Sequence, residues 1–406
     1  MLGVAIFRQD AAHRKSFFFG TYTRMRQSRV RVSTRSIRPA GTVADSSARF
    51  EQVLAEARKG GGLGGEDILF LLGQTDSVRV ERLFAAARRL RQEHFDDRVF
   101  LYGFVYFSTY CRNDCAFCQH RRSSSAGQRY RKTAADILGA ARRLADDGVH
   151  LIDLTMGEDP RYFEDQPAGF DQLAEKIRGV KSETGLPVMI SPGVLPQEAL
   201  RQMAHAGADW YACYQETHNP DLFKTLRPNQ SYSERWQAKV DATGAGLLVE
   251  EGILSGVGET LDDVAESIAK MGALGADQVR VMSFVPQQGT PLAGQSAPDV
   301  LRELLIIAVM RLAFPDRLVP ASLDVAGLDG LQCRMDAGAN VVTSLIVPNA
   351  GLTGVASLTR DIATALRMPP AVNSVLARCG LTPAGRDDYC TWMGQRRRAG
   401  ASTKYR

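Results

Sequence analysis

Short β-rich runs alternate with amphipathic helical stretches through most of the chain, and this rhythm constrains the fold more than any other feature. Eight runs have the composition of buried strands: 99–107, 149–155, 187–191, 209–214, 247–254, 278–284, 317–323 and 340–346. Helical stretches separate them, for example 133–147, 169–184, 195–206, 231–243, 261–274 and 298–313. Because parallel strands need long crossovers, usually helices, this order predicts a parallel sheet. Eight such units over about 250 residues fit a closed (β/α)8 barrel of the α/β class.

The chain divides into four segments by composition and pattern. A helical N-terminal extension at 51–97 precedes the barrel at 98–390, and a basic tail at 391–406 contains three consecutive arginines that we expect to be solvated. Residues 1–50 contain ten Lys or Arg and two Asp, which gives this segment a net charge of +8. The whole chain has a net charge of +5, so residues 51–406 have a net charge of −3. This Arg- and Ser-rich segment is a transit-peptide-like leader, a disordered tail, or the result of a start placed upstream of Met25.

Charge, hydropathy and cysteine content indicate which partners and which cellular compartment to expect for this protein. The body of the chain is mildly acidic, so its basic leader gives no support to a nucleic-acid partner. No run reaches the roughly 18 apolar residues of a membrane span, so we expect no membrane association. The seven cysteines are an odd count, and three of them fall within eight residues. We therefore expect a cytoplasmic protein in a reducing compartment, with one metal site rather than a disulfide framework.

The three clustered cysteines lie in the segment Cys-Arg-Asn-Asp-Cys-Ala-Phe-Cys, directly after the first predicted strand. Their C-x3-C-x2-C spacing resembles the signature of the radical S-adenosylmethionine superfamily. Thiolates of Cys111, Cys115 and Cys118 can hold three corners of a [4Fe–4S] cube and leave one iron open. The resemblance implies that this iron binds the amino and carboxylate groups of S-adenosylmethionine. An electron from a reducing donor would then release a 5′-deoxyadenosyl radical.

A zinc site is the alternative for the same loop. The three cysteines with His120 would make a Cys3His set. Structural zinc, however, usually takes ligands from two separated knuckles, whereas these four residues lie on one tight loop. Phe117 precedes the third cysteine, where superfamily members place an aromatic ring against the adenine of the cofactor.

Three residues near other strand ends suit the same cofactor. Glu158 lies in Met156-Gly157-Glu158, where superfamily members carry a Gly-Gly-Glu-like segment that takes the amino group of the cofactor. Glu216, after the fourth strand, suits a pair of ribose hydroxyls. Arg235, at the start of the next helix, could pair with the cofactor carboxylate, or it could be a surface helix residue.

Charged residues also interrupt three apolar strand ends. Asp153, Arg280 and Asp324 stand in such runs, and Ser322 lies two residues before Asp324. Buried charges are costly unless they are paired or bind a ligand. Two carboxylates and one guanidinium suit a zwitterion with two ammonium groups and one carboxylate, such as lysine or ornithine. The alternative is an internal ion pair between Arg280 and either aspartate.

The chain resembles the methylornithine synthase family of pyrrolysine biosynthesis over roughly residues 65–385. The matching segments are RVFLYGFVYFSTYC (98–111), HLIDLTMGEDP (150–160), PVMISPGV (187–194), YQET (214–217), GILSGVGET (252–260), VRVMSFVPQQGTPL (279–292) and PASLDVAGLDG (320–330). The resemblance implies a radical mutase that converts L-lysine to (3R)-3-methyl-D-ornithine. Hydrogen abstraction, fragmentation to a glycyl radical and an aminobutene, and recombination would give the product, with no catalytic side chain beyond the cluster and the cofactor radical.

On the same resemblance, Asp153, Arg280, Ser322 and Asp324 match substrate-binding positions, and Glu216 and Arg235 match cofactor contacts of the wider family. Biotin synthase, a wider relative, is disfavoured because it needs further strand cysteines, and only Cys213 lies on a predicted strand. A hydrogenase-maturase-like enzyme and a non-catalytic iron–sulfur or zinc module remain alternatives. The sequence leaves open the electron donor and the oligomeric state, with a monomer as one option.

Overall fold

The computed structural model describes residues 43–60, 62–126, 128–350 and 365–403. Most of the predicted leader, residues 1–42, lies outside these ranges. The chain divides after Arg49, and the unit from Phe50 onward contains the whole barrel. None of the helices in the described ranges is long and apolar enough to cross a membrane.

All eight predicted strands are present and parallel. They are β1 (Arg98–Ser108), β2 (Leu151–Met156), β3 (Val188–Ser191), β4 (Trp210–Ala212), β5 (Leu248–Ser255), β6 (Gln278–Ser283), β7 (Pro320–Ser322) and β8 (Val341–Leu345). Neighbouring strands follow the order β6-β5-β4-β3-β2-β1-β8-β7. A parallel bridge between Gln278 and Leu318 joins β6 to the residues that enter β7 and completes the circle. The predicted (β/α)8 barrel is therefore confirmed.

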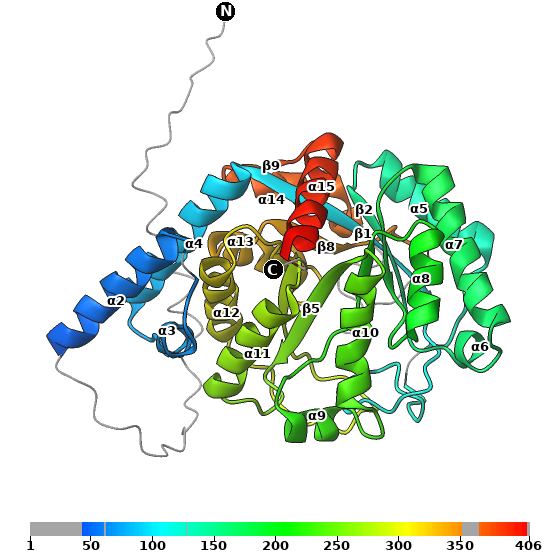
Figure 1. Ribbon diagram of the computed structural model, residues 1–406, viewed down its shortest axis with the longest axis horizontal. Helices are drawn as coiled ribbons and strands as arrows, with labels where there is room; N and C mark the ends of the chain where they lie inside the picture. Colours follow the sequence, from blue (N-terminus) through cyan, green and yellow to red (C-terminus); the bar gives the residue numbers. More distant parts are fainter. Residues whose placement is uncertain (1–42, 61, 127, 351–364, 404–406) are drawn as a thin grey trace, which may run out of the picture. The chain divides into compact units, whose positions relative to one another are not determined.

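The predicted crossover helices surround the strands (Figure 1). They are α5 (Ala134–Asp146), α7 (Ala168–Thr184), α8 (Gln197–His205), α10 (Tyr232–Gly244), α11 (Leu261–Leu274) and α12 (Val300–Ala313). Local chemistry sets their ends. Thr133 and Thr260 begin α5 and α11 with reciprocal capping boxes, and Gly185 ends α7 in the left-handed conformation that glycine adopts without strain.

Short helices lie in the segments that follow β2, β4, β7 and β8: α6 (Pro160–Phe163), α9 (Pro220–Leu226), η1 (Gly327–Gly330), α13 (Leu331–Asp336) and η2 (Ala365–Arg367). Before the barrel come α2 (Val43–Arg58), α3 (Gly65–Leu72) and α4 (Ser77–Phe95). Both α3 and α4 pack against α12. Their buried side chains include Leu71, Leu83 and Phe84, so the stripes of apolar residues on these helices join the outer core.

The amino-terminal end of the barrel is plugged by the last helix. After α14 (Pro369–Arg378) and β9 (Thr382–Pro383), α15 (Arg386–Thr403) brings Tyr389 and Trp392 into one apolar cluster with Phe100, Tyr102 and Trp210. The indole rings of Trp210 and Trp392 stack with centroids 5.9 Å apart. This plug closes the end of the barrel opposite the cysteine loop.

Of the three consecutive arginines, Arg396 is not solvated, contrary to the expectation from sequence, whereas the side chain of Arg397 is 43% exposed. Arg396 donates to Asp316 at 2.8 Å and contacts Asp277, and its side chain is only 11% exposed. Arg397 pairs with Asp209 at 2.8 Å. Acidic residues near the amino-terminal ends of the strands thus hold the helix in place, a long-range pairing that a local charge run does not reveal.

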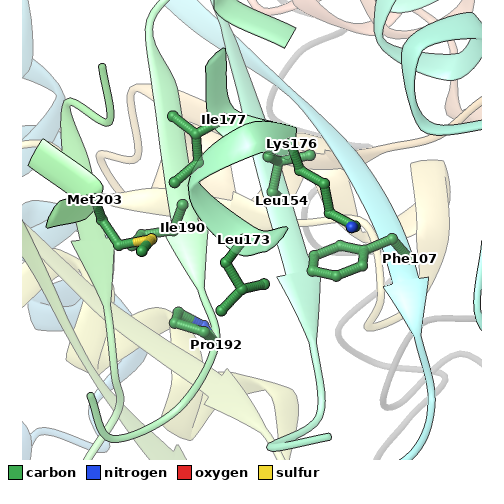
Figure 2. A pocket seen from close by; sticks show the side chains of 8 residues that line it. All are labelled: Phe107, Leu154, Leu173, Lys176, Ile177, Ile190, Pro192 and Met203. Atoms are coloured by element: carbon green, nitrogen blue, oxygen red, sulfur yellow. The ribbon is translucent and has the colours of Figure 1, made fainter. Parts of the chain in front are cut away.

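A small hollow lies in the outer layer, between the sheet and α7 and α8 (Figure 2). Its lining consists of Phe107, Leu154, Leu173, Lys176, Ile177, Ile190, Pro192 and Met203. Figure 2 shows mainly apolar side chains converging there, with Lys176 the one charged member. The hollow belongs to helix–sheet packing and not to the barrel interior.

Candidate active site

The cysteine loop follows β1 at the carboxyl end of the barrel. The thiol of Cys115 accepts hydrogen bonds from Arg227 Nη1 at 3.3 Å and Gln230 Nε2 at 3.1 Å. Burial raises the pKa of Cys111 to about 11 and raises the pKa of Cys118 further, and in both cases the charge of Cys115 adds to the effect. The three thiols therefore lie close enough to oppose one another's ionisation.

This donor set fits an iron–sulfur cluster. Cationic iron would reverse the penalty for ionising three neighbouring buried thiols. In the described part of the chain, no three His, Cys, Asp or Glu side chains converge at distances that suit a single metal ion. A four-iron cube instead takes its cysteine ligands at separate corners.

The structure brings Glu158 and Arg235 together. Arg235 Nη2 donates to Glu158 Oε1 at 3.1 Å, and Arg112 Nε donates to Oε2 at 3.0 Å. Burial alone would raise the pKa of Glu158, but the two arginines and nearby amide donors hold it below its usual value. The Arg235 side chain is 4% exposed, so the surface-residue alternative is wrong. A Cβ on Gly193 would come within 2.0 Å of Glu158 Cγ, so only glycine fits beside this carboxylate.

Glu216 adopts a left-handed backbone conformation, with φ of 67°. Its carboxylate accepts from Arg227 Nη2 at 2.6 Å, while burial raises its pKa against the opposing charge of Arg227. The guanidinium of Arg227 also lies 5.3 Å from the ring centre of Phe117. Arg227, which the sequence analysis missed, thus links Glu216, Phe117 and Cys115.

Asp153 lies on β2 inside the barrel and is 1% exposed. Its Oδ1 accepts from Ser191 Oγ at 2.9 Å, whereas its Oδ2 has no hydrogen-bond partner within the described ranges. Burial raises the pKa of Asp153 to about 7; the hydroxyls of Ser191 and Thr155 lower it, and Glu250 adds to the rise. One carboxylate oxygen is therefore buried and available.

Arg280 on β6 pairs with Glu250 on β5, not with either aspartate as the alternative from sequence supposed. Its Nε donates to Glu250 Oε1 at 2.5 Å, and its Nη1 donates to Thr343 Oγ1 at 3.2 Å. Tyr214 donates its hydroxyl to Glu250 Oε2 at 2.9 Å. Arg280 Nη2 is buried and has no hydrogen-bond partner in the described residues.

Asp324, after β7, belongs to a second network. Its Oδ1 accepts from Arg367 Nη1 at 2.7 Å, and its Oδ2 accepts from Tyr106 at 3.0 Å and Ser344 at 2.9 Å. The hydroxyls of Ser322 and Ser344 lie 3.3 Å apart. Asp324 and Ser322 are thus neighbours, as sequence spacing predicted, but the charge of Asp324 already has an internal partner.

A bulge in β8 connects the two networks. Pairing with β1 steps from Leu101–Val342 to Gly103–Leu345, so β8 has one extra residue, and Ser344 has a φ of 65°. Consecutive strand residues ordinarily point to opposite faces. The bulge instead lets Thr343 reach Arg280 while Ser344 reaches Asp324.

Comparisons with known proteins decide the family. A sequence profile described as the radical SAM superfamily matches residues 105–271. The 3-methylornithine synthase of Methanosarcina barkeri is 41% identical over 345 residues, which cover 85% of this chain and 97% of that protein. The Methanosarcina acetivorans synthase is also 41% identical, over 81% of this chain and 93% of its own. This chain belongs to the 3-methylornithine synthase family. It is a radical S-adenosylmethionine enzyme whose cofactors are a [4Fe–4S] cluster and S-adenosylmethionine.

Solved structures agree with this membership. A crystal structure of methylornithine synthase superposes with a TM-score of 0.79 at 42% identity, covering 84% of this chain and 99% of that one. Among other relatives, the HydE subunit of the [FeFe] hydrogenase maturase of Thermotoga maritima is 31% identical over 64% of this chain and 74% of its own. A HydG maturase structure, at 19% identity and a TM-score of 0.70, shares the fold alone.

Proposed function

We propose that this enzyme converts L-lysine to (3R)-3-methyl-D-ornithine for pyrrolysine biosynthesis. One observation in the structure supports it most directly. Asp153 Oδ2 and Arg280 Nη2 are buried polar atoms in one electrostatic cluster, and neither has a hydrogen-bond partner in the described ranges. A buried acceptor and a buried cationic donor without partners are costly unless a ligand supplies both complements. An amino acid offers an ammonium group to the first and a carboxylate to the second.

The charge balance favours a basic amino acid. The two networks joined by β8, together with the nearby Asp153, contain three carboxylates, of Asp153, Glu250 and Asp324, and two guanidiniums, of Arg280 and Arg367. With Asp153 ionised, this set has a net charge of −1. Lysine near neutral pH has two ammonium groups and one carboxylate, a net charge of +1. A neutral amino acid would leave one buried carboxylate without a counter-ion.

We assign Cys111, Cys115 and Cys118 to the cluster, and Phe117, Glu158, Glu216 and Arg235 to S-adenosylmethionine. When bound, these cofactors supply a primary radical that abstracts a hydrogen atom. The protein then has to hold the reactive fragments at fixed positions and orientations until they recombine. Paired charges that are fixed before the substrate arrives suit that task, because they need no rearrangement during the reaction.

Glu158 and Arg235 suit the two ends of the amino-acid moiety of the cofactor, since they lie side by side with opposite charges. Glu216, held by Arg227, presents a carboxylate near Phe117 that suits ribose hydroxyls. A reducing electron donor completes the requirement. We further propose a cytoplasmic location, where the seven free thiols of the chain would stay reduced.

Anaerobic reconstitution with S-adenosylmethionine, a reductant and isotopically labelled lysine tests the proposal. The expected product is labelled 3-methylornithine, identified by mass and by chiral chromatography. Formation of 5′-deoxyadenosine with no lysine isomer would overturn it and would favour an activity like that of the hydrogenase maturase. Absence of both products from a protein with its full iron content would favour a non-catalytic module.

A further inference from the structure

We infer that Glu250 is a positioning residue for the substrate: it fixes the guanidinium of Arg280 so that Nη2 stays directed to the carboxylate of the amino acid. The inference rests on the proposed function, since it names a residue that acts on lysine through Arg280. Sequence reasoning did not single out Glu250, and the family resemblance assigned it no role.

Arg280 is held at two points and left open at a third. Its Nε is bound to Glu250 Oε1 and its Nη1 to Thr343 Oγ1, at 2.5 and 3.2 Å. The side chain is 2% exposed and that of Glu250 is 0% exposed. Two fixed contacts on a planar guanidinium leave no free rotation about its bonds, so the direction of Nη2 is set before any ligand binds.

Both carboxylate oxygens of Glu250 already have hydrogen-bond donors, so Glu250 does not bind the ammonium group of the substrate directly. One oxygen accepts from Arg280 and the other accepts from the Tyr214 hydroxyl at 2.9 Å. The ring of Tyr214 is fixed in turn, because a Cβ on Gly252 would lie within 2.9 Å of it, and it lies 5.6 Å from the Arg280 guanidinium. Glu250 therefore acts through Arg280, and Asp153 remains the carboxylate with an open oxygen.

Other buried Glu–cation pairs in the same chain show what a purely structural pair looks like. Arg334 meets both oxygens of Glu303 with Nε and Nη2, at 2.6 and 3.0 Å. Lys239 donates to Glu251 and to Gln215. Neither cation has a buried side-chain nitrogen without a hydrogen-bond partner in the described ranges, whereas Arg280 does. Arg280 therefore differs from these two cations in having a terminal guanidinium nitrogen left for a ligand.

The test compares Glu250→Gln with Glu303→Gln, which disrupts a buried pair elsewhere. Initial rates with lysine give kcat and KM, and inhibition by 1,5-diaminopentane, which is lysine without its carboxylate, gives an inhibition constant. We expect Glu250→Gln to raise the KM for lysine about 10- to 100-fold, the range for loss of a charge-assisted contact. The inhibition constant for diaminopentane should change little, because that molecule has no carboxylate for Arg280.

Tyr214→Phe provides a second variant in case Glu250→Gln folds poorly. It keeps both charges and removes one hydrogen bond to Glu250, so it should raise the KM for lysine several-fold, less than Glu250→Gln because the effect reaches Arg280 only through Glu250. In Glu303→Gln, the ratio of the KM for lysine to the inhibition constant for diaminopentane should stay at the wild-type value. An unchanged ratio in folded Glu250→Gln and Tyr214→Phe would overturn the positioning role while wild-type turnover still upheld the proposed function. Failure of the wild type to convert lysine would instead count against the proposed function.

Discussion

Replacing Asp153 with asparagine should stabilise the substrate-free protein and abolish lysine binding. Burial raises the pKa of Asp153 from 3.8 to about 7, because a charged carboxylate without a full set of partners is unfavourable inside the barrel. The folded protein therefore holds this proton more tightly than the unfolded chain. The stability that Asp153 contributes is present below its unfolded pKa and is lost as pH rises through about 7.

The size of the effect follows from the same values. Between pH 5 and pH 7 the unfolded aspartate is ionised, whereas the folded one goes from almost fully protonated to about half protonated. Each pH unit in that window lowers the wild-type free energy of unfolding by up to about 1.4 kcal/mol. An asparagine side chain cannot ionise, so the variant should gain about 2 kcal/mol on wild type across these two units, about 3 kcal/mol by pH 8, and no more above that pH. Asp146→Asn, at an exposed position, is the matched control and should show no such trend.

Urea unfolding at pH 5, 6, 7 and 8, followed by the fluorescence of the buried pair Trp210 and Trp392, measures the difference. Lysine should raise the unfolding midpoint of wild type at pH 8 and leave that of Asp153→Asn unchanged. A stability difference that does not widen with pH would refute the buried-carboxylate reasoning. A variant that still gains stability from lysine would refute the assignment of Asp153 to the ammonium group.

Three further predictions concern separate parts of the site. Cys118→Ser should lose most of its bound iron and sulfide after reconstitution and keep its far-UV circular dichroism; full iron retention would contradict the assignment. Asp324→Ala should lower lysine turnover and leave the visible spectrum of the cluster intact, and a lost spectrum would refute its role at the substrate. Ser344→Gly should be more stable than Ser344→Ala by about 1 kcal/mol, because φ of 65° suits glycine. Equal melting temperatures for those two variants would show that the bulge is not strained.

The barrel could be predicted from sequence because its determinants are local. The strands and their crossover helices differ in hydrophobic period, and turn or cap residues such as Thr133 and Gly185 lie at the boundaries. Placement of the cysteine loop at the end of β1 followed from chain order alone. Asp153 and Arg280 could be singled out because a charge within an apolar strand needs a partner or a ligand.

The identity of the partners could not be predicted, because pairing depends on which strands and loops meet in three dimensions. Glu250 is 30 residues from Arg280, and Arg367 is 43 residues from Asp324. The adjacent acids Glu250 and Glu251 were the available signal, since alternation sends one to the interior and the other to α10. The bulge at Ser344 had no sequence signal, because serine is an uncommon residue at positive φ.

The most direct test of the central claim follows hydrogen from lysine to the cofactor. Anaerobic enzyme with its full cluster content is incubated with S-adenosylmethionine, reductant and lysine deuterated along its side chain. The account predicts deuterium in the recovered 5′-deoxyadenosine, appearing together with 3-methylornithine and lost in the Asp153→Asn variant. Undeuterated 5′-deoxyadenosine alongside unchanged lysine would contradict it.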